Sequence, residues 1–436
     1  MGDCNNGDLL LSYTADAAPF DDRRFSKHIH DNVHGNIYLD RQSLKFIDTE
    51  QFQRLRDLKQ LGLTYMVYPG AVHSRFEHSL GVYCLASDAV QRLKNYQGLE
   101  LGIESFDIKT VKLAGLPHDV GHGPFSHMFE REFLPRVCDS INWSHEDMSS
   151  KMIDYIVDDH SIDIDSDTLK KVKDLIVASE EGKSECSKEK QFLYDIVANG
   201  RNGIDVDKFD YIERDTRACG LGCNFQFQRL METMRVIDDE ICYRAKEYLT
   251  IHKLFSSRAD LHRTVYMHPK VKAIELMVVD ALIKANDHFQ IAANIDEPAQ
   301  YWMLDDTIVK RIETSTHQDL EESRNLIRRI RRRDIYQFCN EFAVPKENLE
   351  HFKNVTAQDI ICSQDYDSFE KLHVKDDCIS HLLPVCYQDM IVRVYTREPK
   401  LVEAVSKAFE NFQMKTYGKK TQVHATPEKK RRLKEK

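Results

Sequence analysis

The feature that most constrains this chain is an almost unbroken amphipathic helical pattern from Lys27 to about Asn340, with few proline or glycine interruptions. Apolar residues that recur every three or four positions form one face of a helix, which is buried against other elements. One such stripe is Phe52, Leu55, Leu58 and Leu61. We expect Gly62 to end that helix, and Ser144 with Asp147 to begin another. The pattern predicts a mostly α core.

Strand-like segments are few: Ile37–Leu39, Arg235–Ala245 and Met390–Thr396. The helical pattern weakens near Val344, after which one strand and one helix, over Lys400–Phe412, predict a small α+β C-terminal lobe. We therefore divide the chain into a flexible leader (1–26), a helical domain (27–340), the small lobe (341–415) and a basic, disordered tail (416–436).

Composition narrows the class of protein. Of the 436 residues, 42% are hydrophobic, which is enough to bury one large domain and a smaller lobe. No run of about 18 apolar residues occurs, so we expect no membrane partner. Eleven cysteines without a CxxC pair favour reduced thiols in the cytoplasm or nucleus, and the basic tail is typical of a nuclear localisation signal. The net charge of −10 argues against a generic nucleic-acid binder.

The most informative residues are histidines and aspartates in the order His78, His118-Asp119, Asp207. Two imidazoles and two carboxylates suit iron, zinc, manganese or magnesium far better than calcium. A single His-Asp pair is common by chance, but the full set followed by further glycines and histidines is much more specific. The sequence therefore predicts a divalent-metal site built from distant segments.

Three stretches around these residues carry a family resemblance. YPGAVHSRFEHSLGV (68–82), LAGLPHDVGHGPFSHMFE (113–130) and RNGIDVDKFDYIERD (201–215) resemble the SAM-and-HD-domain deoxynucleoside triphosphate triphosphohydrolases of the HD superfamily. The resemblance runs from about Lys27 to His288 and returns between Ile379 and Phe412. It implies an HD-domain helical core and metal ligation by His78, His118, Asp119 and Asp207. We expect the SAM module of that family to be absent, because 26 residues cannot hold it.

The resemblance also implies catalytic roles for His122, His127 and His145, with His127 or His145 as the general acid. Glu130 stands where the family has an aspartate that supports the histidine pair. Asp207, Tyr211 and Asp215 share one helix face by their spacing, as do Arg258, His262 and Tyr266. The substrate-binding residues implied by the resemblance are Gln60, Leu61, Arg75, Lys208, Tyr211, Asp215, Arg258, His262 and Tyr266. Tyr266 would exclude a ribose 2′-hydroxyl, and Met267 replaces a family glutamine.

Regulation and assembly are implied in the same way. Lys27, Asp48, Gln53 and Arg56 would bind an activating guanine nucleotide (GTP). Arg229, Arg244 and Lys246 would bind an activating deoxynucleotide (dNTP). Both sites would lie between subunits of a dimer or tetramer, with magnesium accompanying the bound nucleotides.

Two other classes of function stay open. One is another HD phosphohydrolase, acting on a nucleoside monophosphate or a cyclic nucleotide, although the cations at positions 75, 208 and 258 favour a polyphosphate. The other is a non-catalytic scaffold for single-stranded nucleic acid, suggested by the basic run Arg328–Arg333. Ile327, Ile330 and Ile335 interleave with that run, so a solvated amphipathic helix explains it more economically.

Overall fold

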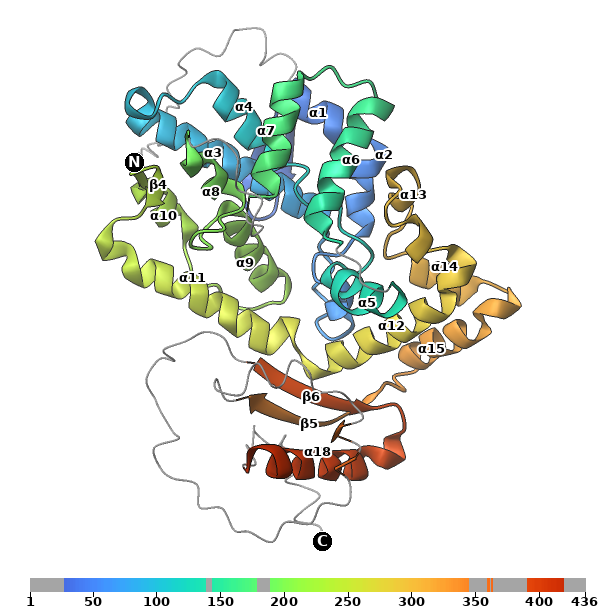
Figure 1. Cartoon of the computed structure of the whole chain (residues 1–436). Helices are drawn as coiled ribbons and strands as arrows, with labels where there is room; N and C mark the ends of the chain where they lie inside the picture. Colours follow the sequence, from blue (N-terminus) through green and yellow to red (C-terminus); the bar gives the residue numbers. More distant parts are fainter. Residues whose placement is uncertain are drawn as a thin grey trace, which may run out of the picture.

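The computed structural model of the chain describes residues 27–138, 143–178, 189–344, 359–360, 362–363 and 390–418. The predicted leader, and the tail beyond residue 418, lie outside these ranges. The fold is mostly α, with two-stranded sheets as its β structure in the described part. A large helical body carries a smaller unit of two strands and one helix at one end (Figure 1).

The helical body consists of long helices joined by short ones. The longer helices are α3 (Arg75–Leu101), α4 (Ser105–Ala114), α6 (His145–Asp159), α7 (Ser166–Ile176), α9 (Val206–Ala218), α11 (Tyr248–Leu261), α12 (Pro269–Phe289) and α15 (Glu321–Arg331). The shorter ones are α1 (Arg41–Ile47), α2 (Glu50–Gln53), α5 (Leu134–Val137), α8 (Tyr194–Val197), α10 (Phe227–Thr233), α13 (Pro298–Tyr301) and α14 (Ile308–Thr314). Two π-helical turns, η4 (Phe129–Phe133) and η7 (His262–Tyr266), interrupt the α pattern.

Helix α3 lies at the centre of the body and packs against α4 and α9. The buried apolar residues of its first two-thirds include Val82, Ala86 and Val90, each with no exposed surface. The predicted helix start at Ser144 is confirmed, because its hydroxyl accepts a hydrogen bond from the backbone N–H of Asp147. Helix α15 is amphipathic as predicted, with Ile327 and Ile330 buried in the main core.

The predicted helix through Phe52–Leu61 is wrong in extent. The structure has α2, then a 3₁₀ turn η2 (Arg54–Asp57), and Leu58 is extended. Backbone hydrogen bonds from Gln60 to His73 and from Arg75 to Leu58 draw this segment toward the start of α3. Gly62, with a positive φ of 49°, begins the 3₁₀ turn η3 (Gly62–Met66) instead of ending a helix. Tertiary pairing therefore overrides the helical spacing of the leucines.

The strand predictions have mixed outcomes. Ile37–Leu39 lies in β2 (Gly35–Leu39), whose antiparallel partner β1 (Lys27–Asp31) we did not predict. Arg235–Ala245 is not one strand: β3 (Arg235–Ile237) and β4 (Glu240–Cys242) form a hairpin. Asp238 and Asp239 at its turn both have positive φ, a conformation that aspartate tolerates in tight hairpin turns.

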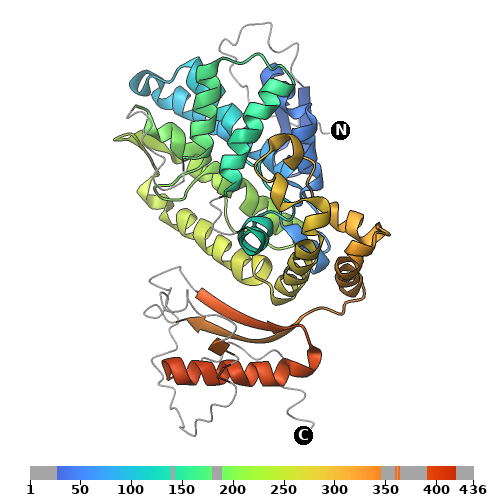
Figure 2. The same ribbon diagram turned by 45° about the vertical axis from the view of Figure 1, so that its right-hand side comes forward.

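The C-terminal unit pairs β5 (Gln337–Val344) with β6 (Met390–Thr396), and α18 (Val402–Tyr417) packs on them. Strand β6 and the helix confirm the sequence prediction, whereas β5 was not predicted and crosses the boundary we placed after residue 340. In Figure 2 the strands lie between α18 and the helical body. Tyr395 links the two by donating a hydrogen bond to the carbonyl of Pro269 at the start of α12 (3.3 Å). Among the described helices, none combines the length and apolar character needed to cross a bilayer.

Candidate active site

Three elements bring the predicted metal ligands together. His78 lies in the first turns of α3, His118 in the turns after α4, and Asp207 in the first turn of α9. One ligand atom from each lies within 4.8 Å of the other two. Asp119 completes the set. Its Oδ2 lies 3.5 Å from His78 Nε2, and its Oδ1 lies 3.5 Å from His118 Nε2. All four residues that the sequence nominated therefore converge.

The orientation of the two imidazoles suits metal binding. His118 Nδ1 donates to the carbonyl of Gly115 (3.0 Å), which leaves Nε2 as the ring atom with a lone pair. That Nε2 is buried and has no hydrogen-bond partner. His78 Nδ1 donates to the Asp210 carboxylate (2.6 Å), so its Nε2 also faces the centre. Metal-binding histidines usually hold their second nitrogen in this way, so the residues present fit a divalent cation.

The charge balance of this centre also favours a bound divalent cation. Burial would lower the pKa of His78, but hydrogen bonds to Asp207 and Asp210 outweigh it and raise the pKa to about 10. Three carboxylates, those of Asp119, Asp207 and Asp210, surround this one ring. Arg75 pairs with Asp119 and Arg214 with Asp210, and the negative charge that remains in this buried site is balanced by protons or by a bound cation.

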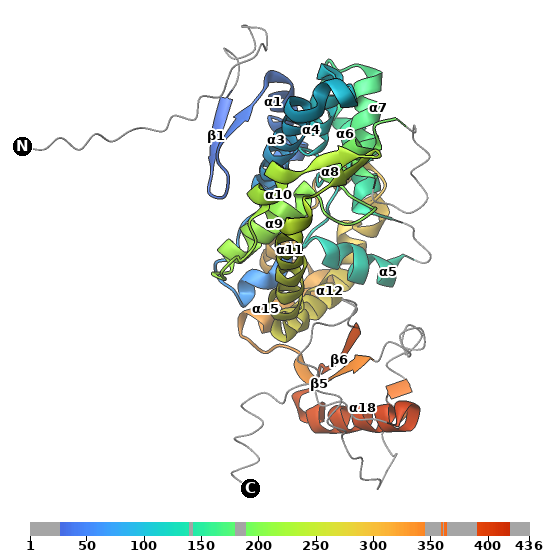
Figure 3. The same cartoon turned by 90° about the vertical axis from the view of Figure 1, so that its left-hand side faces the viewer.

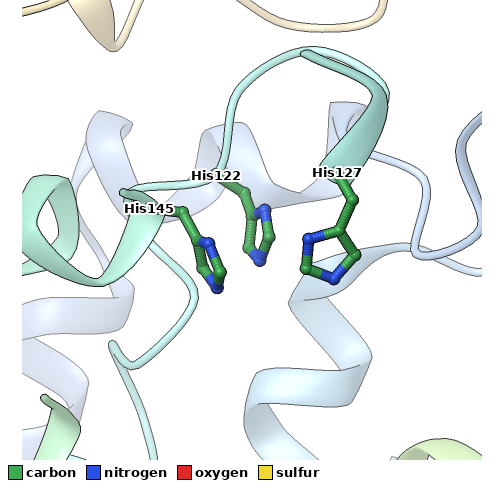
Figure 4. Close-up of side chains that lie close together, drawn as sticks. All are labelled: His122, His127 and His145. Carbon is green, nitrogen blue, oxygen red and sulfur yellow. The ribbon is translucent and has the colours of Figure 1, made fainter. Parts of the chain in front are cut away.

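A second centre lies directly beside the first. His122, His127 and His145 form a cluster in which one ring nitrogen from each lies within 4.8 Å of the others. The rings of His122 and His145 stack at 3.8 Å, and the ring of His127 stands nearly perpendicular to both (Figure 4). Asp119 joins the two centres, because its Oδ1 lies 3.3 Å from His122 Nε2.

Glu130 supplies the negative charge of the histidine cluster. It lies in the π-turn η4 and accepts a hydrogen bond from His145 Nδ1 (3.0 Å), with His127 Nδ1 at 3.6 Å. Burial would lower the pKa of His145, but the hydrogen bond to Glu130 and the nearby Glu146 raise it above its usual range. Burial lowers the pKa of His122 and His127, with Arg75 nearby adding to the effect. His145 is therefore the member of the cluster that holds a proton most strongly.

The two residue rows predicted from helical spacing face each other. One row lies on α9, and the other lies on α11 and the turn η7 that follows it. Arg258 Nε donates to the hydroxyl of Tyr211 (3.0 Å), and the hydroxyl of Tyr266 donates to Asp215 (2.6 Å). The turn η7 is π-helical, with more residues per turn than an α-helix, and it keeps Tyr266 on the face that carries Arg258. His262 lies between them, 4.9 Å from the Tyr266 ring, and burial and Arg258 lower its pKa to about 4.

The remaining predicted substrate residues border the same region. Arg75 is buried, donates to Ser126 (2.9 Å) and forms an ion pair with Asp119. Lys208 pairs with Asp205 (2.8 Å). Gln60 and Leu61 lie in the loop that bonds to His73, and the buried Gln60 Oε1 has no hydrogen-bond partner. A buried unsatisfied acceptor is costly unless a ligand or water pairs with it.

The predicted regulatory residues lie at the surface in separate pairs. Lys27 Nζ lies 3.6 Å from Asp48 Oδ2, and Arg56 Nε donates a hydrogen bond to Gln53 Oε1 (2.7 Å). Arg229 forms two hydrogen bonds with Glu247, at 2.8 and 3.0 Å, a partner that we did not predict. The other two members of this set, Arg244 and Lys246, flank the start of the 3₁₀ turn η6 (Ala245–Glu247).

Several residues of the site escaped the sequence analysis. Asp210 and Arg214 follow Asp207 at three and seven positions, a helical spacing that could have revealed them. His73, whose Nε2 is 2.7 Å from Asp215, lies within a quoted motif and was not singled out. His34, which reaches Asp210 from the β1–β2 turn, left no local signal because its partner lies 176 residues away.

Comparison with known proteins agrees with this geometry. Residues 75–215, from the start of α3 to Asp215, match the HD domain model, and residues 225–365 match the model of the HD-associated region. The HD domain holds a divalent metal, so the fold and the site define an HD-domain protein.

Curated relatives narrow the family. The chain is 41% identical to the deoxynucleoside triphosphate triphosphohydrolase SAMHD1 homolog of Dictyostelium discoideum, over 89% of this chain and 81% of the relative. It is 35% identical to human deoxynucleoside triphosphate triphosphohydrolase SAMHD1, over 85% of this chain and 70% of that protein. The chicken protein is 34% identical, over 88% and 74%. The chain belongs to the SAMHD1 family of HD-domain proteins.

Proposed function

We propose that this protein hydrolyses deoxynucleoside triphosphates to a deoxynucleoside and inorganic triphosphate. The observation that carries the proposal is the pairing of two centres through Asp119: a carboxylate-rich cation site and a histidine cluster beside it. The names of the curated relatives support the same reaction. Together they supply what cleavage at the α-phosphorus needs: charge neutralisation, an activated water and a proton for the leaving 5′-oxygen.

A divalent cation bound by His78, His118, Asp119 and Asp207 would supply Lewis acidity and lower the pKa of a bound water. Of the two histidines that the family resemblance offered as general acid, we choose His145. The raised pKa of His145 and its shorter distance to Glu130 keep its ring protonated. The His145 side chain is also more buried, at 13% exposed against 50% for His127, so bulk water competes less for its proton. Glu130 would hold the ring in place, and Arg75, Lys208 and Arg258 would meet the phosphates.

The sugar is assigned to the contact between α9 and η7. The hydroxyl of Tyr266 is fixed by Asp215, which His73 holds from the other side. Burial and the adjacent Asp215 raise the pKa of Tyr266, so the phenol stays neutral. A rigid phenol at this position would leave no space for a 2′-hydroxyl, which is the basis for selecting deoxynucleotides.

Activation and assembly belong to the proposal as well. Lys27 at the start of β1 and Asp48 at the end of α1, with Gln53 and Arg56, would receive GTP at a subunit interface. Arg229, Arg244 and Lys246 would receive a dNTP. Glu247 forms an ion pair with Arg229, so a nucleotide phosphate would have to compete with that carboxylate.

Product analysis tests the reaction. The purified protein is incubated with each dNTP and, as a matched control, each ribonucleotide, with manganese or magnesium and with or without GTP. We expect deoxynucleoside and triphosphate, ribonucleotides hydrolysed at least about 100-fold more slowly, and faster turnover with GTP. Release of pyrophosphate or single phosphate would reject the assigned reaction and favour another HD phosphohydrolase.

A further inference from the structure

The buried carboxylate of Asp210 lies directly behind the metal centre. It accepts four hydrogen bonds, two at each oxygen. Oδ2 accepts from His78 Nδ1 (2.6 Å) and Arg214 Nε (2.9 Å), and Oδ1 accepts from His34 Nε2 (2.6 Å) and Arg214 Nη2 (2.8 Å). This fills the accepting capacity of a carboxylate, so Asp210 has one defined orientation. His78, one of the four proposed metal ligands, takes its orientation from it.

Two of the groups that fix this arrangement come from the β1–β2 hairpin. His34 lies in its turn, and Asp31 ends β1 and binds Arg214 at 2.9 and 3.2 Å. Asp31 also accepts from the backbone N–H groups of Val33 and His34, which shapes the turn itself. The hairpin runs along the outer edge of the helical body (Figure 3), and much of its surface is exposed.

The packing around Asp210 leaves no alternative position for the carboxylate. A Cβ atom on Gly81, one turn after His78 in α3, would lie 1.9 Å from Asp210 Oδ1 and 2.7 Å from Arg214 Nη2. The side chains of Arg214, His34 and Asp210 are almost fully buried, and the ring of His34 packs edge-on against Phe227 of α10. Loss of the His34 donor would therefore leave a desolvated lone pair that water cannot easily satisfy.

We propose that His34 is a positioning residue of the metal centre, and that docking of the β1–β2 hairpin and occupancy of the metal site stabilise each other. The inference rests on the proposed metal ligation by His78. The chain of contacts from His34 through Asp210 to His78 gives the hairpin a direct mechanical and electrostatic link to the cation. Thermodynamic linkage then requires that whatever orders one of them favours the other.

The test measures manganese binding and amide hydrogen exchange on the full chain. His34→Ala should raise the manganese dissociation constant by about tenfold, the lower end of the cost of losing a group bonded directly to a ligand, because His34 acts through Asp210. His34→Gln, whose amide can still donate to Asp210, should recover most of the affinity. In the native protein, manganese should slow exchange of the amides of residues 27–39 by about tenfold, and it should not do so in His34→Ala.

His30→Ala is the matched control, because His30 lies in the same hairpin but is exposed and its ring hydrogen-bonds the Asn36 side chain (3.0 Å) and not Asp210. Its manganese affinity should equal that of the native protein. If His34→Ala melts at a lower temperature but binds manganese normally, the residue is merely structural and the inference is overturned while the proposed reaction stands. If the native protein hydrolyses dNTPs but manganese does not change the amide exchange rates of the hairpin, the proposed linkage between hairpin docking and metal binding is wrong. Absence of any manganese binding in the native protein would overturn both proposals.

Discussion

Two neighbouring centres of this protein use the same side chains in opposite proportions. In the first centre, the carboxylates of Asp119, Asp207 and Asp210 outnumber the two imidazoles of His78 and His118. Arg75 and Arg214 each pair with one of these carboxylates, which leaves a net negative charge. In the cluster of His122, His127 and His145, three imidazoles share the carboxylates of Glu130 and Glu146, and Asp119 of the first centre reaches only His122. The first composition attracts a cation, and the second holds a proton beside a site that can receive an anion. The ratio of acid to imidazole, more than the residue types, assigns the chemistry.

Removing a proposed metal ligand should have the largest effect and should impair the first centre alone. His118→Ala should lower triphosphate release at least about 1000-fold, because Lewis-acid stabilisation is worth several kcal/mol. Metal content after dialysis should fall with it. His145→Ala is the comparison variant and should retain its metal. Equal metal loss in both variants would show that the two centres are not separable.

Removing the carboxylate of the second centre should have a smaller effect. Glu130→Gln should lower kcat by about 100-fold and leave KM and metal content little changed. Glu130 raises the pKa of His145, and the protonated ring is the proposed acid, so kcat falls as the pH rises through that pKa. In Glu130→Gln this decline should therefore begin at lower pH. A pH profile with an unshifted alkaline limb would remove His145 from the role of acid.

A change behind the first centre should have the smallest effect. Gly81→Ala places a methyl group against Asp210 and Arg214, and we expect a loss of about 1 to 3 kcal/mol in the free energy of unfolding. Gly98→Ala, in the same helix, would meet only the flexible Lys94 side chain and should be neutral or slightly stabilising. Urea denaturation of both variants checks this. Equal stability would show that Asp210 and Arg214 can move aside without loss of folding free energy.

The sequence predicted the helical class and the convergence of His78, His118, Asp119 and Asp207, because periodicity and short motifs are visible locally. His118-Asp119 is a dipeptide, and the Tyr211 and Arg258 stripes repeat at helical spacing. Asp31 and His34 could not be found in that way, since each acts on a residue of α9 about 180 positions later and neither lies in a periodic pattern. Likewise, the leucines before Gly62 gave a false helix because pairing with His73 and Arg75 decides that segment. Long-range hydrogen bonds remain invisible to local reasoning.

The π-turn at His262–Tyr266 makes the length of this helix as important as its composition. A π-turn behaves as an α-helix with one extra residue, so deleting one residue here would let the helix close into a regular spiral. Because the π-turn absorbs that residue, the side chains beyond the deletion would keep nearly the same direction around the axis. A deletion inside the regular helix α11 would instead rotate every later side chain by about 100°. The Tyr266 phenol would then leave its Asp215 partner although no functional group had been removed, so the proposed sugar contact is sensitive to where in the helix a residue is lost.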